Sequence, residues 1–216
     1  MCGSLPHRRV RYPMYLSRLV LNPRHPLARR DFSNPYAMHA TLSWLFEDPK
    51  AARPLWRLES TRPPTVLLQS LMRPDFSRLD TRDGFAGYFA QAPETKPQEL
   101  AVRLREGQVL RFRLEANPTV TRGGKRHGLR RIEEQLLWLH RQAEKAGFAV
   151  LGANVTRTER RSFPKRGQEQ AIVLWVARFD GVLQVRDPGK LRNAIQEGIG
   201  HGKALGLGLL SVALMR

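Results

Sequence analysis

The spacing of apolar residues at the start of the chain predicts a strand followed by a helix. Residues 15–21 (YLSRLVL) form a short apolar-rich run closed by an Asn-Pro pair, as is typical of a strand. Residues 24–33 are predicted as a basic loop. A helix is predicted to begin at Pro35, with Asn34 or Ser33 as its N-cap, because proline is favoured at the first helical position. Its predicted buried stripe is Met38, Leu42 and Leu45.

Further strand patterns complete the first half of the chain. Residues 56–59 and 65–71 are predicted strands joined by a proline-containing turn. Residues 76–88 have a weak helical pattern, and residues 87–91 have the pattern of an edge strand. Residues 92–98 (APETKPQ) are predicted as a linker because prolines and polar residues interrupt the apolar periodicity.

The second half repeats this order of elements without visible sequence identity. Residues 109–116 alternate between apolar and polar and predict a strand, whereas residues 117–128 are predicted as a basic, glycine-containing loop. A helix is predicted at 129–146, with Gly147 as its C-terminal cap. Its predicted apolar stripe is Ile132, Leu136, Leu139 and Ala143.

Two strands, a short helix and a last strand follow in the pattern. The strands are predicted at 149–155 and 171–185, the second with a turn at Asp180-Gly181. The helix is predicted at 187–197 and the last strand at 209–214. Two split βαβ units side by side follow from this order, so the predicted fold class is α+β.

This repeat predicts two domains. We expect one at residues 14–95 and the other at residues 107–216, with a linker at 96–106. Residues 1–13 lack the apolar segment of a signal peptide and are predicted to be a disordered extension. Met14, which opens the first strand pattern, is the expected native start.

A glycine-rich ending stands out at residues 198–211 (GIGHGKALGLGLLS). Five of the 17 glycines of the chain lie between Gly198 and Gly208, around a single lysine, Lys203. Two interpretations are open. Main-chain amides and Lys203 suit a phosphate backbone, but glycines also serve a sharp turn before a buried strand.

Charge adds a class of partner to this picture. The 216 residues include 37 Lys and Arg against 19 Asp and Glu, a formal net charge of +18. Such a surplus predicts a polyanionic partner, with nucleic acid first and an anionic membrane surface second. The only cysteine is Cys2, so no disulfide framework is available and a reducing cytoplasm is expected. No apolar run approaches the roughly 18 residues of a membrane span.

Tyr36 and His39 are the leading candidates for chemistry. They stand three residues apart at the start of the predicted helix and project from one side of it. A helix N-terminus favours phosphate, and histidine is the natural acid or base near neutral pH. The alternative is a surface histidine beside a capping turn.

Metal chemistry has little support in the sequence. The six histidines form no HxH or HExxH arrangement. Asp75, Asp80 and Asp83 lie close together, but their arginine-rich setting favours a solvated loop. We therefore expect no metal and no cofactor.

Three basic stretches are candidate RNA or DNA contacts, although each also fits a solvated face. Together on one small protein they favour nucleic-acid binding. They are Arg24, Arg29 and Arg30; Arg122, Lys125, Arg126, His127, Arg130 and Arg131; and Arg157, Arg160, Arg161, Lys165 and Arg166. The third lies between two predicted strands, where a hairpin would press into a duplex groove.

With these residues in view, the chain resembles the CasE family of CRISPR-associated endoribonucleases. The matching segments span nearly all of the chain after Met14 and keep the family order. They are residues 14–23 (MYLSRLVLNP), 29–31 (RRD), 34–39 (NPYAMH), 56–59 (WRLE), 110–118 (LRFRLEANP) and 198–211 (GIGHGKALGLGLLS).

The resemblance implies two tandem ferredoxin-like (βαββαβ) domains. It implies cleavage of CRISPR repeat RNA at the base of a stem-loop, without a metal, leaving a 2′,3′-cyclic phosphate. The protein would then stay bound to the mature RNA among the other subunits of Cascade. The catalytic histidine and its tyrosine partner fall on His39 and Tyr36, and the basic hairpin falls on residues 157–166. RNA would also meet Gly200, Gly202 and Lys203 of the glycine-rich ending.

Metal-free cleavage needs one group to take the 2′-OH proton and another to protonate the leaving oxygen. His39 is expected to serve in one of these two roles, with Tyr36 positioning the nucleophile or sharing the transfer. A non-catalytic subunit that binds an RNA hairpin is the alternative function. A membrane-surface protein ranks last, because no predicted helix combines basic residues with a broad aromatic face.

Overall fold

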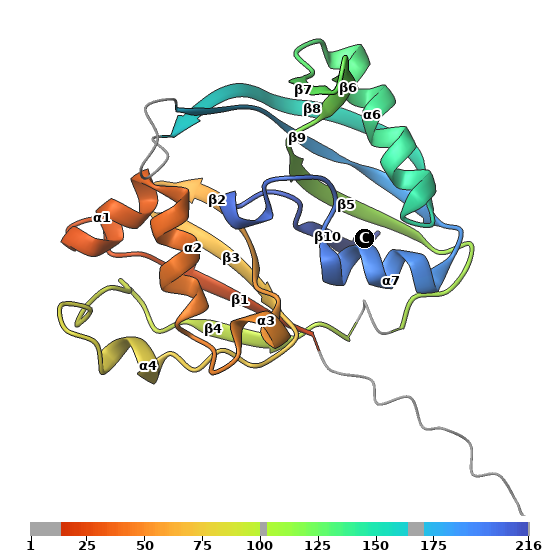
Figure 1. The fold of residues 1–216 in the computed structure, drawn as a ribbon. Coiled ribbons are helices and arrows are strands. Elements are labelled where there is room, and N and C mark those ends of the chain that lie inside the picture. Colours follow the sequence, from red (N-terminus) through yellow and green to blue (C-terminus); the bar gives the residue numbers. More distant parts are fainter. Residues whose placement is uncertain (1–13, 100–102, 164–170, 216) are drawn as a thin grey trace, which may run out of the picture.

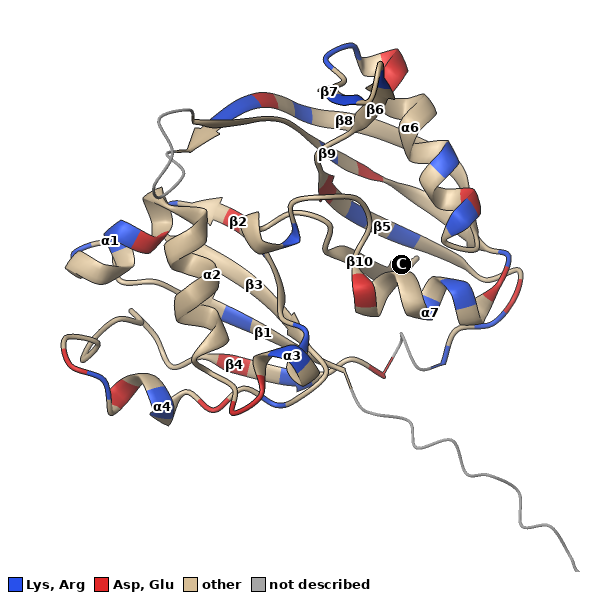
Figure 2. Ribbon diagram, in the orientation of Figure 1, with Lys and Arg blue, Asp and Glu red and all other residues tan. Residues whose placement is uncertain are grey.

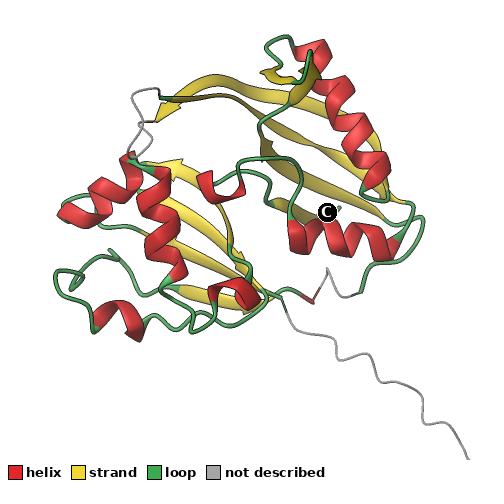
Figure 3. Cartoon of the chain, in the orientation of Figure 1, coloured by secondary structure: helices red, strands yellow, loops and turns green. Residues whose placement is uncertain are grey.

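The computed structural model describes residues 14–99, 103–163 and 171–215, which form two sheets with helices packed on them (Figure 1, Figure 3). The extension predicted at residues 1–13 lies outside the described residues. One sheet is built from the described residues before position 100, the N-terminal half. The other is built from those after position 102, the C-terminal half.

The sheet of the N-terminal half has four antiparallel strands in the order β2-β3-β1-β4. Its strands are β1 (Tyr15–Val20), β2 (Leu55–Thr61), β3 (Pro64–Ser70) and β4 (Glu94–Pro97). Its helices are α1 (Pro26–Ser33), α2 (Pro35–Ser43), α3 (Pro49–Ala52) and α4 (Ser77–Asp80). Met38 and Leu42 of α2 pack against Leu19, Val66 and Leu68 of the sheet, so the predicted apolar stripe of α2 is its buried face.

The sheet of the C-terminal half repeats this arrangement in the order β10-β5-β9-β8, again antiparallel. Its strands are β5 (Val109–Ala116), β8 (Phe148–Phe163), β9 (Ile172–Val185) and β10 (Leu210–Leu214). Its helices are α6 (Ile132–Lys145) and α7 (Pro188–Glu197), and a short 3-10 turn, η1, covers Lys203–Leu205. A separate hairpin consists of β6 (Thr119–Arg122) and β7 (Lys125–Gly128).

Both halves share one topology. The first and third strands lie in the centre of each sheet, and the second and fourth strands lie at its edges. A helix joins the first strand to the second, and another joins the third to the fourth. This βαββαβ order is the ferredoxin-like arrangement, so the predicted α+β class with two such units is confirmed.

The loop predicted at residues 24–33 is wrong, because the segment forms helix α1. His25 caps this helix by accepting a hydrogen bond from the Ala28 N–H (3.4 Å), and Pro26 takes the first helical position. An N-cap residue followed by proline predicted α2, and His25-Pro26 has the same pattern. The basic residues of the segment led to its prediction as a loop.

The fourth strand of the first sheet also differs from its prediction. Phe89 makes only an isolated bridge with Leu21, so residues 87–91 are not the edge strand. The edge is β4, which falls inside the linker predicted at 92–98 and is tied to β1 by a Ser17–Thr95 hydroxyl contact of 2.8 Å. Within the weakly helical stretch at 76–88, only α4 is an α-helix.

The C-terminal half corrects three further predictions. The loop predicted at 117–128 contains the hairpin β6–β7. Strand β9 continues through the turn predicted at Asp180-Gly181, where a Cβ on Gly181 would lie 2.3 Å from the Gly152 carbonyl oxygen. This glycine permits close strand packing and does not reverse the chain. On α6, Ile132 is half exposed, and Gln135 and Trp138 are buried in addition to Leu139.

Arg57 on β2 joins the two halves. Its side chain is buried and donates to the main-chain oxygens of Arg113 (3.2 Å) and Leu209 (3.0 Å) and to Ser211 Oγ (2.9 Å), all in the C-terminal half. Glu59 supplies the counter-charge and also pairs with Arg113 at 3.2 Å. A second link runs from Gln69 Nε2 to the Ile195 carbonyl oxygen (2.6 Å).

Glu115 on β5 forms the centre of a neighbouring network. Its carboxylate is buried and pairs with Arg161 at 2.5 Å, Arg178 at 2.8 Å and Arg157 at 3.4 Å. Burial alone would raise the pKa of Glu115, but Arg161 and Arg178 bring that pKa below its usual range. Arg178 also donates to the Leu58 carbonyl oxygen (2.8 Å) and so reaches the N-terminal half.

Replacing Arg57 with methionine should lower the free energy of unfolding by about 3–5 kcal/mol, because two carbonyl oxygens, Ser211 and Glu59 lose the buried guanidinium that pairs with them. Arg18→Met is the matched control. Arg18 pairs with Glu94 at 3.7 Å on the surface, and such exposed pairs contribute about 0–1 kcal/mol. Urea unfolding followed by circular dichroism measures both. Equal losses would contradict the role given to Arg57.

Candidate active site

Helix α2 begins as predicted and presents both candidate residues. Asn34 caps it by accepting hydrogen bonds from the N–H groups of Tyr36 (3.0 Å) and Ala37 (3.4 Å). His39 follows one turn later and is half-buried, whereas Tyr36 is 38% exposed. The buried stripe of α2 therefore holds the helix while its first turn stays open.

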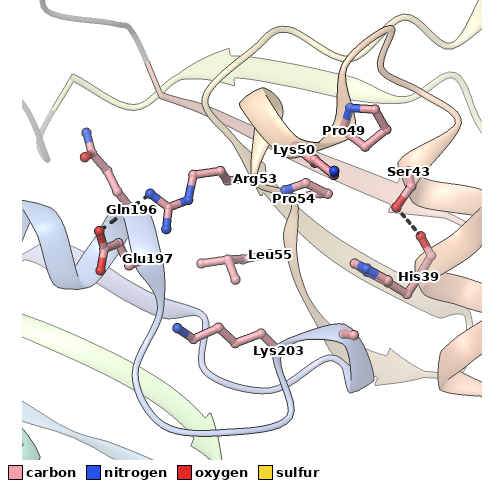
Figure 4. Close-up of a pocket in the computed structure, with 11 residues that line it drawn as sticks. His39, Ser43, Pro49, Lys50, Arg53, Pro54, Leu55, Gln196, Glu197 and Lys203 are labelled. Carbon is pink, nitrogen blue, oxygen red and sulfur yellow. Dashed lines mark hydrogen bonds and ion pairs between the residues drawn. The ribbon is translucent and has the colours of Figure 1, made fainter.

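His39 lines a cavity of about 370 Å³ between the two halves (Figure 4). Helix α2, helix α3 and the start of β2 form one wall, and the end of α7 with η1 forms the other. The lining residues are His39, Ser43, Pro49, Lys50, Arg53, Pro54, Leu55, Gln196, Glu197, Lys203 and Ala204. Tyr36 is not among them. Lys and Arg mark both walls, on α3 and on η1 (Figure 2).

The surroundings of His39 favour its neutral imidazole. Burial lowers its pKa below the ordinary value of 6.5. Within the part of the chain that the structure describes, Nδ1 is buried and has no hydrogen-bond partner. The main-chain oxygen of His39 accepts a hydrogen bond from Ser43 Oγ (2.7 Å), which steadies the turn that carries the ring. Because Nδ1 is buried, Nε2 is the ring nitrogen through which a neutral imidazole could accept a proton from a ligand.

The glycine-rich ending supplies the second wall of the cavity. Gly206 has φ +78°, and a Cβ there would lie 2.6 Å from the Trp56 ring, so η1 approaches the N-terminal half closely. This contact brings η1 against α2 and β2 and places Lys203 in the cavity with His39. The glycines of the segment therefore permit the packing, as the structural interpretation predicted, and Lys203 lines the cavity, where its contact with a ligand remains a prediction.

Gly200 and Gly202 have less room than an open phosphate cradle would leave. Added Cβ atoms would meet Trp138 at 3.2 Å and Leu207 at 3.1 Å, respectively. Both glycines have positive φ angles, +81° and +85°. Their geometry is explained by the turn, and their contact with RNA remains a prediction.

The predicted contacts on α1 and β7 differ in their surroundings. Arg29 is exposed, whereas Arg30 pairs with the buried carboxylate of Asp31 at 2.7 Å. Lys125 and Arg126 are exposed on the β6–β7 hairpin. The pKa of His201 is lowered by its burial and then by the charges of Arg126 and Lys203, so the hairpin and the glycine-rich ending share one positive region.

The predicted basic hairpin on β8 is divided between two tasks. Arg157 and Arg161 pair with buried Glu115. Arg160 is exposed and forms no ion pair or hydrogen bond with any described residue. Lys165 and Arg166 lie outside the described residues. Of the described candidates here, Arg160 has its charge free for a ligand.

Four cavity residues, Lys50, Arg53, Gln196 and Glu197, were not among the predicted site residues. Lys50 and Arg53 carry a weak signal, two cations beside a capped Asp-Pro turn. Glu197 comes from the other half of the chain, and its ion pair with Arg53 (3.5 Å) exists only in the folded protein. Local sequence contains no trace of that pairing.

The described residues contain neither a metal-binding cluster nor a membrane-spanning helix. No group of three or more His, Cys, Asp or Glu in residues 14–99, 103–163 and 171–215 is placed to hold a metal ion. Among the helices in the same ranges, none has the length and apolar character needed to cross a bilayer.

The chain is similar to known proteins over nearly its whole length. A family model described as "CRISPR associated protein" matches residues 14–213. The CRISPR-associated endoribonuclease Cse3 of Thermus thermophilus is 42% identical, over 93% of this chain and 100% of that protein. The Cascade subunit CasE of Escherichia coli is 31% identical, over 93% of this chain and 99% of its own length.

Solved structures agree with this relationship. A structure of Thermus thermophilus Cse3 bound to an RNA that represents a pre-cleavage complex superimposes with a TM-score of 0.83. The two chains are 39% identical, and the match covers 94% of this chain and 100% of the other.

The ring of His39 should titrate below pH 6.5 in an NMR experiment, because burial disfavours the imidazolium. Below pH 6.5 the His39 ring binds a proton in the unfolded chain but stays unprotonated in the folded protein until the pH reaches its lower folded-state pKa. The stability contributed at this site is therefore present above that pH and is lost as the pH falls through the folded-state pKa. His39→Gln should make the free energy of unfolding less dependent on pH in this window. A ring pKa at or above 6.5 would contradict the burial.

Proposed function

The chain belongs to the CRISPR associated protein family, and we propose that it is the endoribonuclease that cleaves CRISPR repeat RNA. Its relatives are named as a CRISPR-associated endoribonuclease and as a Cascade subunit, and they match almost the whole chain. The observation that carries the proposal is His39, a neutral imidazole in a cation-lined cavity between the two halves.

The cut proceeds by attack of the ribose 2′-OH on the adjacent phosphorus. The P–O5′ bond breaks, the leaving 5′-oxygen takes a proton from solvent, and the product strand ends in a 2′,3′-cyclic phosphate. His39 takes the 2′-OH proton as general base, because its lowered pKa keeps it unprotonated near neutral pH. The exposed hydroxyl of Tyr36, one helical turn earlier, orients the nucleophilic ribose.

The cations of the cavity neutralise the RNA backbone, and Lys203 binds that backbone beyond the scissile bond. This lysine reaches the cavity from the opposite wall, so RNA that enters contacts both halves. Fixed cations near a developing charge act as preorganised stabilisation. Together with His39 they supply the proton transfer and charge neutralisation that the reaction requires, which is the basis for proposing a metal-independent mechanism.

After cleavage the RNA stays bound, and the protein carries it into Cascade with the other subunits. Exposed cations on α1, on the β6–β7 hairpin and on β8 support this proposal, because they are available to pair with the phosphates of a stem. We place this activity in the cytoplasm, where a chain with Cys2 as its only cysteine loses nothing to reducing conditions.

His39→Ala should slow cleavage of a repeat hairpin about 100- to 10,000-fold while leaving RNA affinity nearly unchanged, because the loss is of proton transfer. Single-turnover cleavage in EDTA, analysed on a denaturing gel, measures this. An RNA with a 2′-deoxy scissile nucleotide should bind and stay intact. Cleavage that requires added magnesium would refute metal independence, and RNA left intact by the wild type would identify a non-catalytic hairpin-binding subunit.

Arg160 and Arg161 are adjacent but should respond differently to substitution. Arg160→Ala should weaken RNA binding and reduce the slope of log affinity against log salt by about one, because a free cation is lost. Arg161→Ala should lower stability to urea and change the slope little, because Arg161 balances buried Glu115. The reverse pattern would contradict the division of tasks on β8.

A further inference from the structure

The cavity extends beyond the catalytic end. In Figure 4, His39 lies at one end, Arg53, Glu197 and the Lys203 amine lie at the other, and Leu55 lies between them. The chemistry of the cut needs only the end with His39. The far end carries two cations and an apolar floor that this chemistry does not use.

Arg53 is held over the far end by an unusual backbone conformation. Its φ of 47° and ψ of 58° are left-handed, and it is the only residue other than glycine with positive φ among the residues that the structure describes. Such conformations persist where surrounding structure enforces them, and they cluster at ligand sites. The turn from α3 into β2 thus directs the guanidinium toward α7.

Glu197 currently occupies the position where an anionic ligand would pair with Arg53. The two side chains are 3.5 Å apart and remain 49% and 56% exposed, so the pair contributes little to stability and exchanges readily. A phosphate offers Arg53 a bidentate partner. Lys203, on the opposite wall, supplies a second cation to the same end of the cavity.

We infer that this end of the cavity binds an unpaired nucleotide that flanks the scissile bond, with its phosphate on Arg53, its base over Leu55 and the adjoining backbone on Lys203. The inference rests on the proposed function, because the strand must run from His39 into the cavity. The volume of 370 Å³ lies in the range of small-ligand sites, about 300–1,000 Å³, and suits a nucleotide but not a duplex. The site therefore selects for a single-stranded flank beyond the stem.

A cycle of protein and RNA variants tests this site. One RNA carries the stem-loop with its unpaired flank, the other ends at the scissile nucleotide, and both have a 2′-deoxy scissile ribose so that neither is cut. Arg53→Asn is the variant of choice, because asparagine tolerates the left-handed backbone. It should weaken binding of the flanked RNA about tenfold or more and binding of the trimmed RNA less than about twofold. Lys203→Gln should act in the same flank-dependent way.

Two further variants sharpen the result. Glu197→Gln should tighten binding of the flanked RNA alone, because it removes the competing carboxylate from Arg53. Arg18→Asn is the matched control: Arg18 and Glu94 form an ion pair of similar length and exposure (3.7 Å, 50% and 59%) on β1 and β4, outside the cavity. It should show no dependence on the flank.

Equal weakening of both RNAs by Arg53→Asn, no weakening of either, or the same flank dependence in Arg18→Asn would overturn the inference. These outcomes differ from a failure of the proposed function. That failure appears when wild-type protein leaves the all-ribose flanked RNA uncut, or when His39→Ala cuts it as fast as wild type. Circular dichroism of each variant confirms that the fold is intact.

Discussion

The guanidinium of Arg57 is the interaction on which the rest of the molecule depends. It is buried between two sheets that each have their own apolar core, and its donors are satisfied by Glu59, two carbonyl oxygens and a hydroxyl. Burial lowers the pKa of Arg57, an effect that the carboxylate of Glu59 opposes. A charge placed there tolerates few alternative geometries, so it fixes how the two halves meet.

The active site inherits its shape from that fixed junction. His39 and Arg53 belong to one half, and Glu197 and Lys203 belong to the other. A small rotation between the halves would change the distance from His39 to Lys203 before it disturbed either core. The contact of Gly206 with Trp56 adds a second, steric constraint close to the site. The relative positions of the cavity residues are therefore set by the interface between the two ferredoxin-like halves.

Local signals made most of the fold predictable. The Asn34-Pro35 cap, the strict alternation at 109–116 and the apolar stripe of α2 each report on their own neighbourhood, and each was right. Errors arose where distant partners decide: β4 is a strand because β1 pairs with it, and Gly181 lies inside a strand because Gly152 approaches it.

The candidate site divides along the same line. His39 could be singled out because its helix start is local, and Lys203 because glycines surround it. The roles of Arg157 and Arg161 could not be predicted, since both side chains pair with the carboxylate of Glu115, more than forty positions away in the sequence. Arg53 gained its interest only when α7 brought Glu197 beside it.

The wall of the cavity opposite His39 is built from residues that are synthesised long after the histidine. Domains generally form from the N-terminus during synthesis, so α2 and its histidine fold well before the glycine-rich ending exists. Until Gly206 has been synthesised and packs on Trp56, the cavity has only one wall. Lys203, the cation of the opposite wall, is then missing. A nascent chain that has not yet reached Lys203 thus carries His39 without the second wall of the cavity, and cutting of RNA is delayed until the glycine-rich segment has been made.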